Sequence, residues 1–367
     1  MDFLSADRAS GHGVGGDLAL IDEAGLLAEN GRPLWNAIIS AISGRDGRFC
    51  AISIRGNGPM FAEMKDRADS IVWHEYETEA TDSIDDPEVW ARANPGIADG
   101  IKSESYMRDM AARAKGSPAN EADFRAFDLN QPINPAALMI CTVGEWQSCL
   151  VDKLPPPKGP CFVGLDVGGS KSMSAIVAFW PETGRTETYG AFPDTPPLYE
   201  RGTQDGVGRR YERMAQEGSL WTYPGRTTPI ARFLEDALGH ISQRGRIVAL
   251  GADKYKQSEV KDALRDASVR RSVSWRGGGM TGESSHDVIA WQRAVQKGVL
   301  KHRHSVMMES AILNSNLEYD SKGMVRLDKR KHRDRIDALS ASVIAVGLAT
   351  AAFRGRLPGV VTVEKIF

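Results

Sequence analysis

The stretch CFVGLDVGGSKSMSAIVAFW, residues 161–180, holds two apolar segments separated by a short turn that contains glycine. Apolar runs of this length on either side of a glycine turn are typical of a β-hairpin. The first run ends on Asp166, so a carboxylate follows the end of an apolar strand. We therefore predict a hairpin here and take Asp166 as a candidate site residue.

Two more carboxylates occupy comparable positions further along the chain. The stretch RIVALGADKYKQSEVKDAL, residues 246–264, predicts a strand that leads into a helix, with Asp253 at the end of the strand. Residues 286–298 and 334–353 have the apolar spacing of helices, and Asp337 falls in the first turn of the second one. Acids at such ends can converge on one site.

Asp166, Asp253 and Asp337 together favour metal-dependent cleavage of phosphodiesters. Carboxylates are the hard oxygen ligands that Mg²⁺ and Mn²⁺ prefer. Two such ions about 3.5–4 Å apart can activate a water molecule and stabilise the leaving oxygen. Taken singly, each aspartate is more readily a cap or a turn residue, so the prediction rests on the three together.

The charge distribution points to a polyanionic ligand for the second half of the chain. Residues 1–150 contain 24 acidic and 13 basic side chains, whereas residues 151–367 contain 24 and 33. A positive excess of this kind suits a nucleic acid. Basic residues crowd around the third carboxylate, although such a run also suits a solvated face: Lys322, Arg326, Lys329, Arg330, Lys331, Arg333 and Arg335.

The N-terminal part predicts a strand–helix–strand unit. DLALIDEAG from Asp17 and CAISIRG from Cys50 are short apolar runs, and residues 32–43 between them have helical spacing. We expect both strands to be buried and parallel, in an α/β unit that lacks its first strands.

The first of these strands has the form of a Walker B motif. In that motif Asp22 would hold Mg²⁺ through water, and Glu23 would polarise the attacking water. The printed sequence contains no GxxxxGK[ST] loop to bind the β- and γ-phosphates. ATP hydrolysis by this chain is therefore not expected.

In their order and spacing, these motifs resemble the large terminase subunit of tailed bacteriophages along nearly the whole chain. The resemblance rests on FLSADRASGHG, DLALIDEAGLL, AISIRGNG, WARANPGI, FRAFDLNQ, VGLDVGGSKSMSAIVAFW, ALGADKYKQSEVKDAL, the MTG of Met280–Gly282, GVLKHRHSVMMESAILNSN and RIDALSAS. It implies an α/β fold, with a partial P-loop NTPase domain followed by a ribonuclease-H-like nuclease domain whose mixed sheet is flanked by helices. We expect the ATPase part in residues 1–130, a proline-rich linker in 131–160 and the nuclease domain in 161–367.

The resemblance also implies roles for the candidate residues. Asp166, Asp253 and Asp337 match the nuclease carboxylates and would hold two Mg²⁺ or Mn²⁺ ions, while Asp22 and Glu23 match the Walker B motif. ATP would be used only by an intact, full-length motor, because the family's P-loop strand lies upstream of FLSADR. A late start, a decayed prophage gene or a fragment would each explain why this sequence begins after it. The implied partners are double-stranded DNA, a small terminase subunit, the portal ring and further copies of the chain, in the host cytoplasm.

Two alternatives remain beside the nuclease. GLDVGGSK, residues 164–171, also looks like the phosphate loop of sugar kinases of the actin-like ATPase group, although their second phosphate motif and adenosine loop are not found. The other alternative is an inactive terminase remnant from a prophage.

The most apolar stretch, Ala338–Phe353, is shorter than a membrane span and is predicted to be a buried helix, so no membrane partner is expected.

Overall fold

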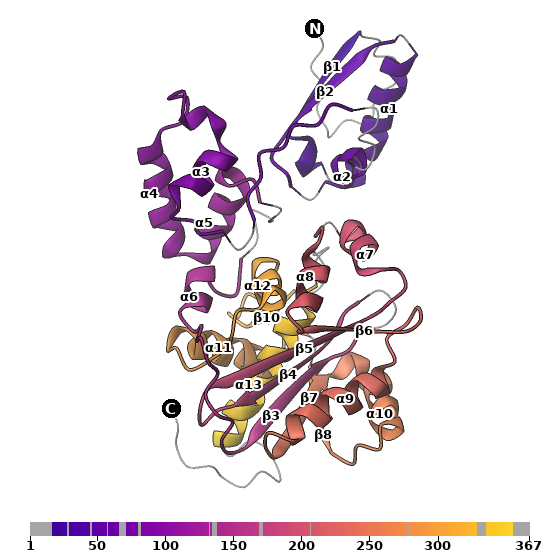
Figure 1. Ribbon diagram of the computed structural model, residues 1–367, viewed down its shortest axis with the longest axis vertical. Helices are drawn as coiled ribbons and strands as arrows, with labels where there is room; N and C mark the ends of the chain where they lie inside the picture. Colours follow the sequence, from indigo (N-terminus) through magenta and orange to yellow (C-terminus); the bar gives the residue numbers. More distant parts are fainter. Residues whose placement is uncertain are drawn as a thin grey trace. The chain divides into compact units, whose positions relative to one another are not determined.

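Figure 1 shows the computed structural model, in which the chain forms two compact units, Met1–Ala136 and Ala137–Phe367. The structure describes residues 17–354, except residues 28, 45, 57, 66–70, 80–81, 132, 134–137, 169–171, 206, 278 and 329–334. The FLSADR segment, most of the glycine turn after Asp166 and the densest part of the basic run lie outside the described residues. Residues 138–160, which the prediction assigned to a linker, belong to the second unit.

The first unit begins with the predicted strand–helix–strand order. β1 (Leu18–Asp22) pairs in parallel with β2 (Arg48–Ile52), and α1 (Arg32–Ser43) connects the two strands. The parallel pairing and the helix boundaries are confirmed. The α-helices that follow in the described part of this unit are α2 (Pro59–Lys65), α3 (Pro87–Ala93), α4 (Glu104–Lys115) and α5 (Pro118–Asp123).

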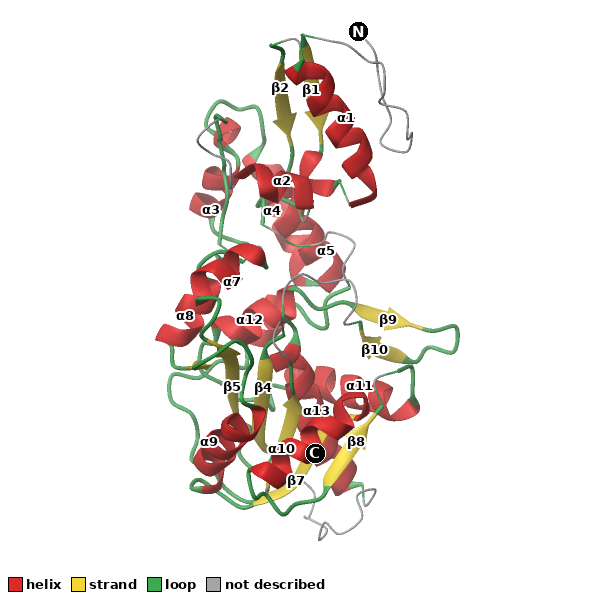
Figure 2. Ribbon diagram, turned by 90° about the vertical axis from the view of Figure 1, so that its right-hand side faces the viewer, coloured by secondary structure: helices red, strands yellow, loops and turns green. Residues whose placement is uncertain are grey.

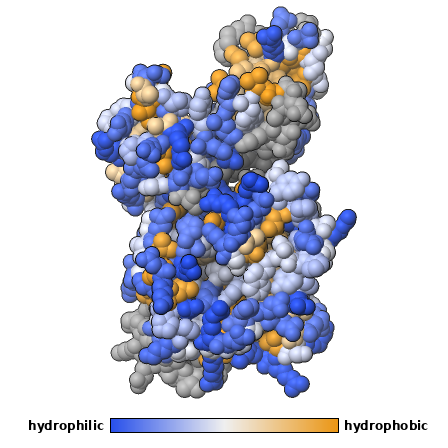
Figure 3. Space-filling model, viewed as in Figure 1, coloured by the Kyte–Doolittle hydropathy of each residue, from blue (hydrophilic) through white to orange (hydrophobic). Residues whose placement is uncertain are grey.

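The prediction that both N-terminal strands are buried is wrong. Leu18, Leu20 and Ile52 are 60%, 62% and 65% exposed, and apolar side chains gather on the surface over β1 and β2 (Figure 3). Side chains alternate between the two faces of a strand, and these three share one face. Only the opposite face, with Ile21 and Phe49, packs into a core cluster with the helices.

The second unit is built on a six-stranded mixed sheet with the strand order β6-β5-β4-β3-β7-β8. The β3–β4 and β4–β5 pairs are antiparallel, whereas β5–β6, β3–β7 and β7–β8 are parallel. This pairing confirms the predicted hairpin. The strands are β3 (Cys161–Asp166), β4 (Ser174–Trp180), β5 (Arg185–Pro193), β6 (Leu220–Tyr223), β7 (Ile247–Asp253) and β8 (Val273–Arg276).

Helices cover both faces of this sheet (Figure 2). One face packs against α11 (Gly282–Gln296), α12 (Val306–Leu313) and α13 (Asp337–Phe353), and the other against α9 (Ile230–Ser242) and α10 (Gln257–Asp266). The central helix α13 is apolar on all sides, as expected of a helix with no solvent face, and this confirms the buried helix predicted there. Its start at Asp337 differs from the predicted start at residue 334, which lies outside the described residues.

Smaller elements complete the second unit. They are α6 (Val143–Gln147), α7 (Leu198–Gln204), α8 (Arg210–Gln216) and the antiparallel hairpin of β9 (Leu317–Tyr319) and β10 (Val325–Leu327). None of the helices in the described part of the chain combines the length and apolarity needed to cross a lipid bilayer.

Candidate active site

Two of the predicted site residues end neighbouring parallel strands. β3 and β7 run side by side, with Leu165 opposite Ala252, and the next residue on each strand is an aspartate: Asp166 and Asp253. Because parallel strands end at the same edge of a sheet, both carboxylates lie at one edge. The sequence pattern of an apolar run ending in Asp is thus sufficient to find both residues.

The two carboxylates also lie on the same face of the sheet. Gly164 and Gly251, two residues earlier on each strand, face α13, since a Cβ at Gly164 would overlap the carbonyl oxygen of Ala341. Side chains two residues apart on a strand point to the same face. Asp166 and Asp253 therefore project on the side that α13 covers.

Helix α13 runs antiparallel to β3, so its first residue lies toward the same edge. The ring of Phe353, at the end of α13, is 6.5 Å from that of Phe162, near the start of β3. Ala341 of α13 contacts Gly164, further along β3. Asp337 is one helical turn before Ala341 and lies beyond it in the direction of Asp166.

The three carboxylates come from three different elements. Asp166 is only 5% exposed, and Asp337 and Asp253 are half-buried. Within the described residues, no three acidic, histidine or cysteine side chains are gathered closely enough to form a metal site. Asp166, Asp253 and Asp337 nevertheless suit Mg²⁺ or Mn²⁺, because all three offer hard carboxylate oxygens and lie toward the same edge of the sheet.

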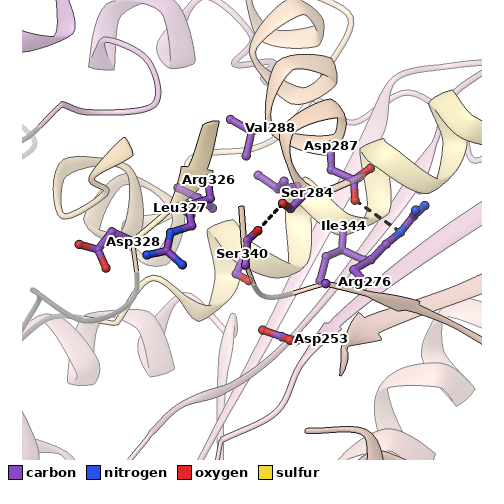
Figure 4. Close-up of a pocket in the computed structure, with 13 residues that line it drawn as sticks. Asp253, Arg276, Ser284, Asp287, Val288, Arg326, Leu327, Asp328, Ser340 and Ile344 are labelled. Carbon is purple, nitrogen blue, oxygen red and sulfur yellow. Dashed lines mark hydrogen bonds and ion pairs between the residues drawn. The ribbon is translucent and has the colours of Figure 1, made fainter. Parts of the chain in front are cut away.

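A pocket of about 120 Å³ opens beside Asp253 (Figure 4). Its wall includes Ser340, on the first turn of α13, and two acids that the sequence analysis did not single out, Asp287 and Asp328. Both are buried, at 4% and 5% exposure. The sequence does carry a signal for the burial of Asp287, because this residue lies one helical turn before Trp291 on the apolar face of a predicted helix.

Arg276 ends β8 opposite Asp253 and pairs with two acids of α11. Its Nη1 donates to Oε1 of Glu283 at 2.6 Å, and its Nε lies 3.4 Å from Oδ2 of Asp287, as Figure 4 shows for the second pair. Burial raises the pKa of Asp287 from 3.8 to about 7, an effect that Arg276 partly opposes and Glu283 adds to. The Asp287 carboxyl also packs directly on Gly347 of α13.

The titration of Asp287 predicts a pH-dependent stability. Because the folded-state pKa lies above that of the unfolded chain, this group favours folding below about pH 4 and loses that contribution as the pH rises toward 7. Between pH 5 and 7, we expect the parent to lose about 2–3 kcal/mol of unfolding free energy relative to Asp287→Asn. Denaturant titrations in EDTA at both pH values measure the difference.

The control for this measurement is Asp266→Asn, at the exposed end of α10, which should follow the pH dependence of the parent. Equal pH dependence in the parent and in Asp287→Asn would contradict the raised pKa.

The other predicted site residues, Asp22 and Glu23, belong to the first unit. Asp22 ends β1, and its Oδ1 accepts a hydrogen bond from the Glu23 backbone N–H at 3.0 Å. Glu23 has a φ of +50°, in the left-handed region that few residues other than glycine adopt. Its Oε2 accepts from the Ser53 hydroxyl, just after β2, at 3.3 Å. The acids therefore follow a strand end, as predicted, while their role in ATP chemistry stays a prediction.

Comparison with known proteins assigns the chain to a protein family. The family model described as "Terminase large subunit, endonuclease domain" matches residues 65–352, most of the chain. The chain belongs to this family. The large terminase subunit of Enterobacteria phage HK97 is 23% identical over 356 residues, covering 94% of this chain and 69% of that protein. The match confirms the resemblance that the motifs indicated and does not favour the sugar-kinase alternative.

One solved terminase structure agrees with this assignment at the level of the fold. The crystal structure of the HK97 large terminase has a TM-score of 0.51 and 23% identity, and covers 94% of this chain and 73% of that one. The large terminase nuclease from thermophilic phage G20c with bound magnesium has a TM-score of 0.35 and 11% identity, covering 53% of this chain and 85% of that one. The family model shows that this terminase chain has an endonuclease domain, and the sheet topology shows that the fold is mixed α/β.

Proposed function

We propose that this terminase cuts double-stranded phage DNA during packaging, with two Mg²⁺ or Mn²⁺ ions held by Asp166, Asp253 and Asp337 in a ribonuclease-H-like domain. The observation that carries the proposal is that Asp166 and Asp253 lie on one face and at one edge of the sheet. Helix α13 begins with the third carboxylate toward that edge. When bound, the ions would activate the attacking water and stabilise the leaving oxygen.

The residues around this edge suit a phosphodiester substrate. The N-terminus of α13 presents the positive end of a helix dipole, which favours anions. Lys254 and Lys256 follow Asp253 directly, and Tyr255 between them is 89% exposed. The Tyr255 backbone N–H donates to Oδ1 of Asp253 at 3.0 Å, so this exposed basic turn is tied to a candidate ligand.

We assign to the first unit, the motor half of the chain, a role in ATP hydrolysis that depends on a complete motor domain. Asp22 and Glu23 would serve Mg²⁺–ATP only in an intact motor, where a phosphate loop completes the nucleotide site. Family membership supports a small terminase subunit, the portal ring and further copies of this chain as partners in the host cytoplasm. The exposed apolar face of β1 and β2 supports contact between the motor half and other protein surface.

The test of the proposal is cleavage of supercoiled plasmid DNA by the full chain. We expect nicked and linear products with Mn²⁺ or Mg²⁺ and none with EDTA. Ca²⁺ should not replace either ion, because it binds the same oxygens with looser geometry. Folded protein that cuts nothing with either ion would overturn the proposal and favour the inactive remnant.

A further inference from the structure

A half-buried ion pair holds the chain two residues before Asp337. Asp205, which follows α7, accepts two hydrogen bonds from the Arg335 guanidinium: Nε to Oδ2 at 3.1 Å and Nη2 to Oδ1 at 3.0 Å. The Tyr211 hydroxyl donates to the same Oδ2 at 2.7 Å. We call these three residues, Asp205, Tyr211 and Arg335, the Asp205 clamp.

The hydrogen bonds of the clamp fix the position and direction of the Arg335 side chain. The Asp205 and Arg335 side chains are only 13% and 22% exposed, and an arginine that donates two parallel hydrogen bonds to one carboxylate is fixed in direction as well as distance. Tyr211 is fully buried on α8, where its ring packs edge-on against Phe192 at 4.9 Å. The carboxylate is thus itself attached to the core.

The position of the clamp in the chain gives it a consequence for the metal site. Arg335 is two residues before Asp337, the first residue of α13. Ile336, at the N-cap position between them, has no polar side chain with which to cap the helix. Asp205 therefore fixes the segment that precedes a candidate metal ligand, although Asp205 and Arg335 lie 130 residues apart in sequence.

We propose that Asp205 is a positioning residue that sets the Asp337 carboxylate for metal binding. This inference rests on the proposed function. Both carboxylate oxygens of Asp205 already accept hydrogen bonds from Arg335 or Tyr211, so its role is to orient the start of α13 and not to ligate the ion. Residues that orient metal ligands in this way typically change metal affinity by about 10–100-fold when they are replaced.

The test compares the full-chain parent with Asp205→Asn, which keeps the shape and removes the charge. We measure plasmid cleavage against Mn²⁺ concentration and, separately, Mn²⁺ binding by calorimetry without DNA. The half-saturating Mn²⁺ concentration should rise about tenfold in both experiments, while the rate at saturating Mn²⁺ stays within about threefold of the parent. Asp205→Glu retains the charge and should recover most of the affinity.

The matched control is Glu187→Gln. Glu187 also accepts from an arginine, Arg185, and from a tyrosine hydroxyl, that of Tyr189, but it lies near the start of β5. That position pairs with the end of β4, at the sheet edge opposite Asp166. This variant should bind Mn²⁺ as the parent does.

The remaining outcomes distinguish failure of the clamp from failure of the proposed function. Unchanged Mn²⁺ affinity in folded Asp205→Asn, or an equal loss in Glu187→Gln, would overturn the clamp and leave the nuclease intact. A parent that neither cuts DNA nor binds Mn²⁺ would overturn the proposed function itself. If Asp205→Asn does not fold, Tyr211→Phe removes one hydrogen bond to the same carboxylate: about a threefold weaker Mn²⁺ affinity supports the clamp, and parental affinity refutes it.

Discussion

Asp166→Asn is expected to abolish DNA cleavage, with a loss on the order of a thousandfold or more, equivalent to about 4 kcal/mol of transition-state stabilisation. The substitution removes a negative charge at the sheet edge where Asp166 and Asp253 both lie, and it changes the side-chain shape very little. Asp253→Asn and Asp337→Asn should behave alike, because in the proposed mechanism all three carboxylates hold the same two ions. Single-turnover cleavage at saturating Mn²⁺, with the parent assayed in parallel, measures the loss.

A DNA-binding assay distinguishes variants that lose only metal-dependent cleavage from variants that are misfolded or no longer bind DNA. All three variants should bind duplex DNA within about threefold of the parent in Ca²⁺, since affinity rests on lysine and arginine contacts with phosphates. Asp266→Asn makes the same chemical change at the exposed end of α10 and should cut normally. If Asp337→Asn retained parental cleavage while Asp287→Asn or Asp328→Asn lost it, the third ligand would be one of the pocket acids instead.

The second large effect is on stability. Gly164→Ala should lower the free energy of unfolding by about 3 kcal/mol or more, because the new Cβ would overlap the Ala341 carbonyl oxygen and approach the Ala345 backbone nitrogen to 2.8 Å. Neither backbone atom can rotate away as a flexible side chain would. Helix α13 must therefore shift from the sheet and carry Asp337 with it, so cleavage should fall too. Denaturant titration and the cleavage assay measure the two effects.

Gly239→Ala on α9 is the matched control for this substitution. Nothing lies within 4 Å of the Cβ it would add, and the position is in the interior of a helix. Alanine is favoured over glycine there, so this variant should be more stable than the parent by up to about 1 kcal/mol. A Gly164→Ala protein as stable as the parent would show that α13 is not in close contact with β3.

Local patterns in the sequence were enough to identify the elements that present the carboxylates. The β3–β4 hairpin, the β7 strand and the buried α13 follow from apolar runs whose length and ends are visible in the chain. Asp166 and Asp253 stand out because each ends such a run. The pairing of β1 with β2 was likewise predictable, but their burial was not, because burial depends on what covers the second face of the sheet.

Only the tertiary structure decided which residues meet. The direction of α13 across β3, the contact at Gly164, the placement of Asp287 against Gly347 and the Asp205–Arg335 pair each join segments that are far apart in sequence. Apolar periodicity says that a helix has a buried face, and it does not say which strand that face meets or in which direction the helix crosses it. The sequence therefore determined the identity of the candidate ligands, whereas long-range packing determined which edge of the sheet they face. The physical reason is that α13 lies directly on β3, where only glycine at position 164 leaves room for the Ala341 carbonyl oxygen.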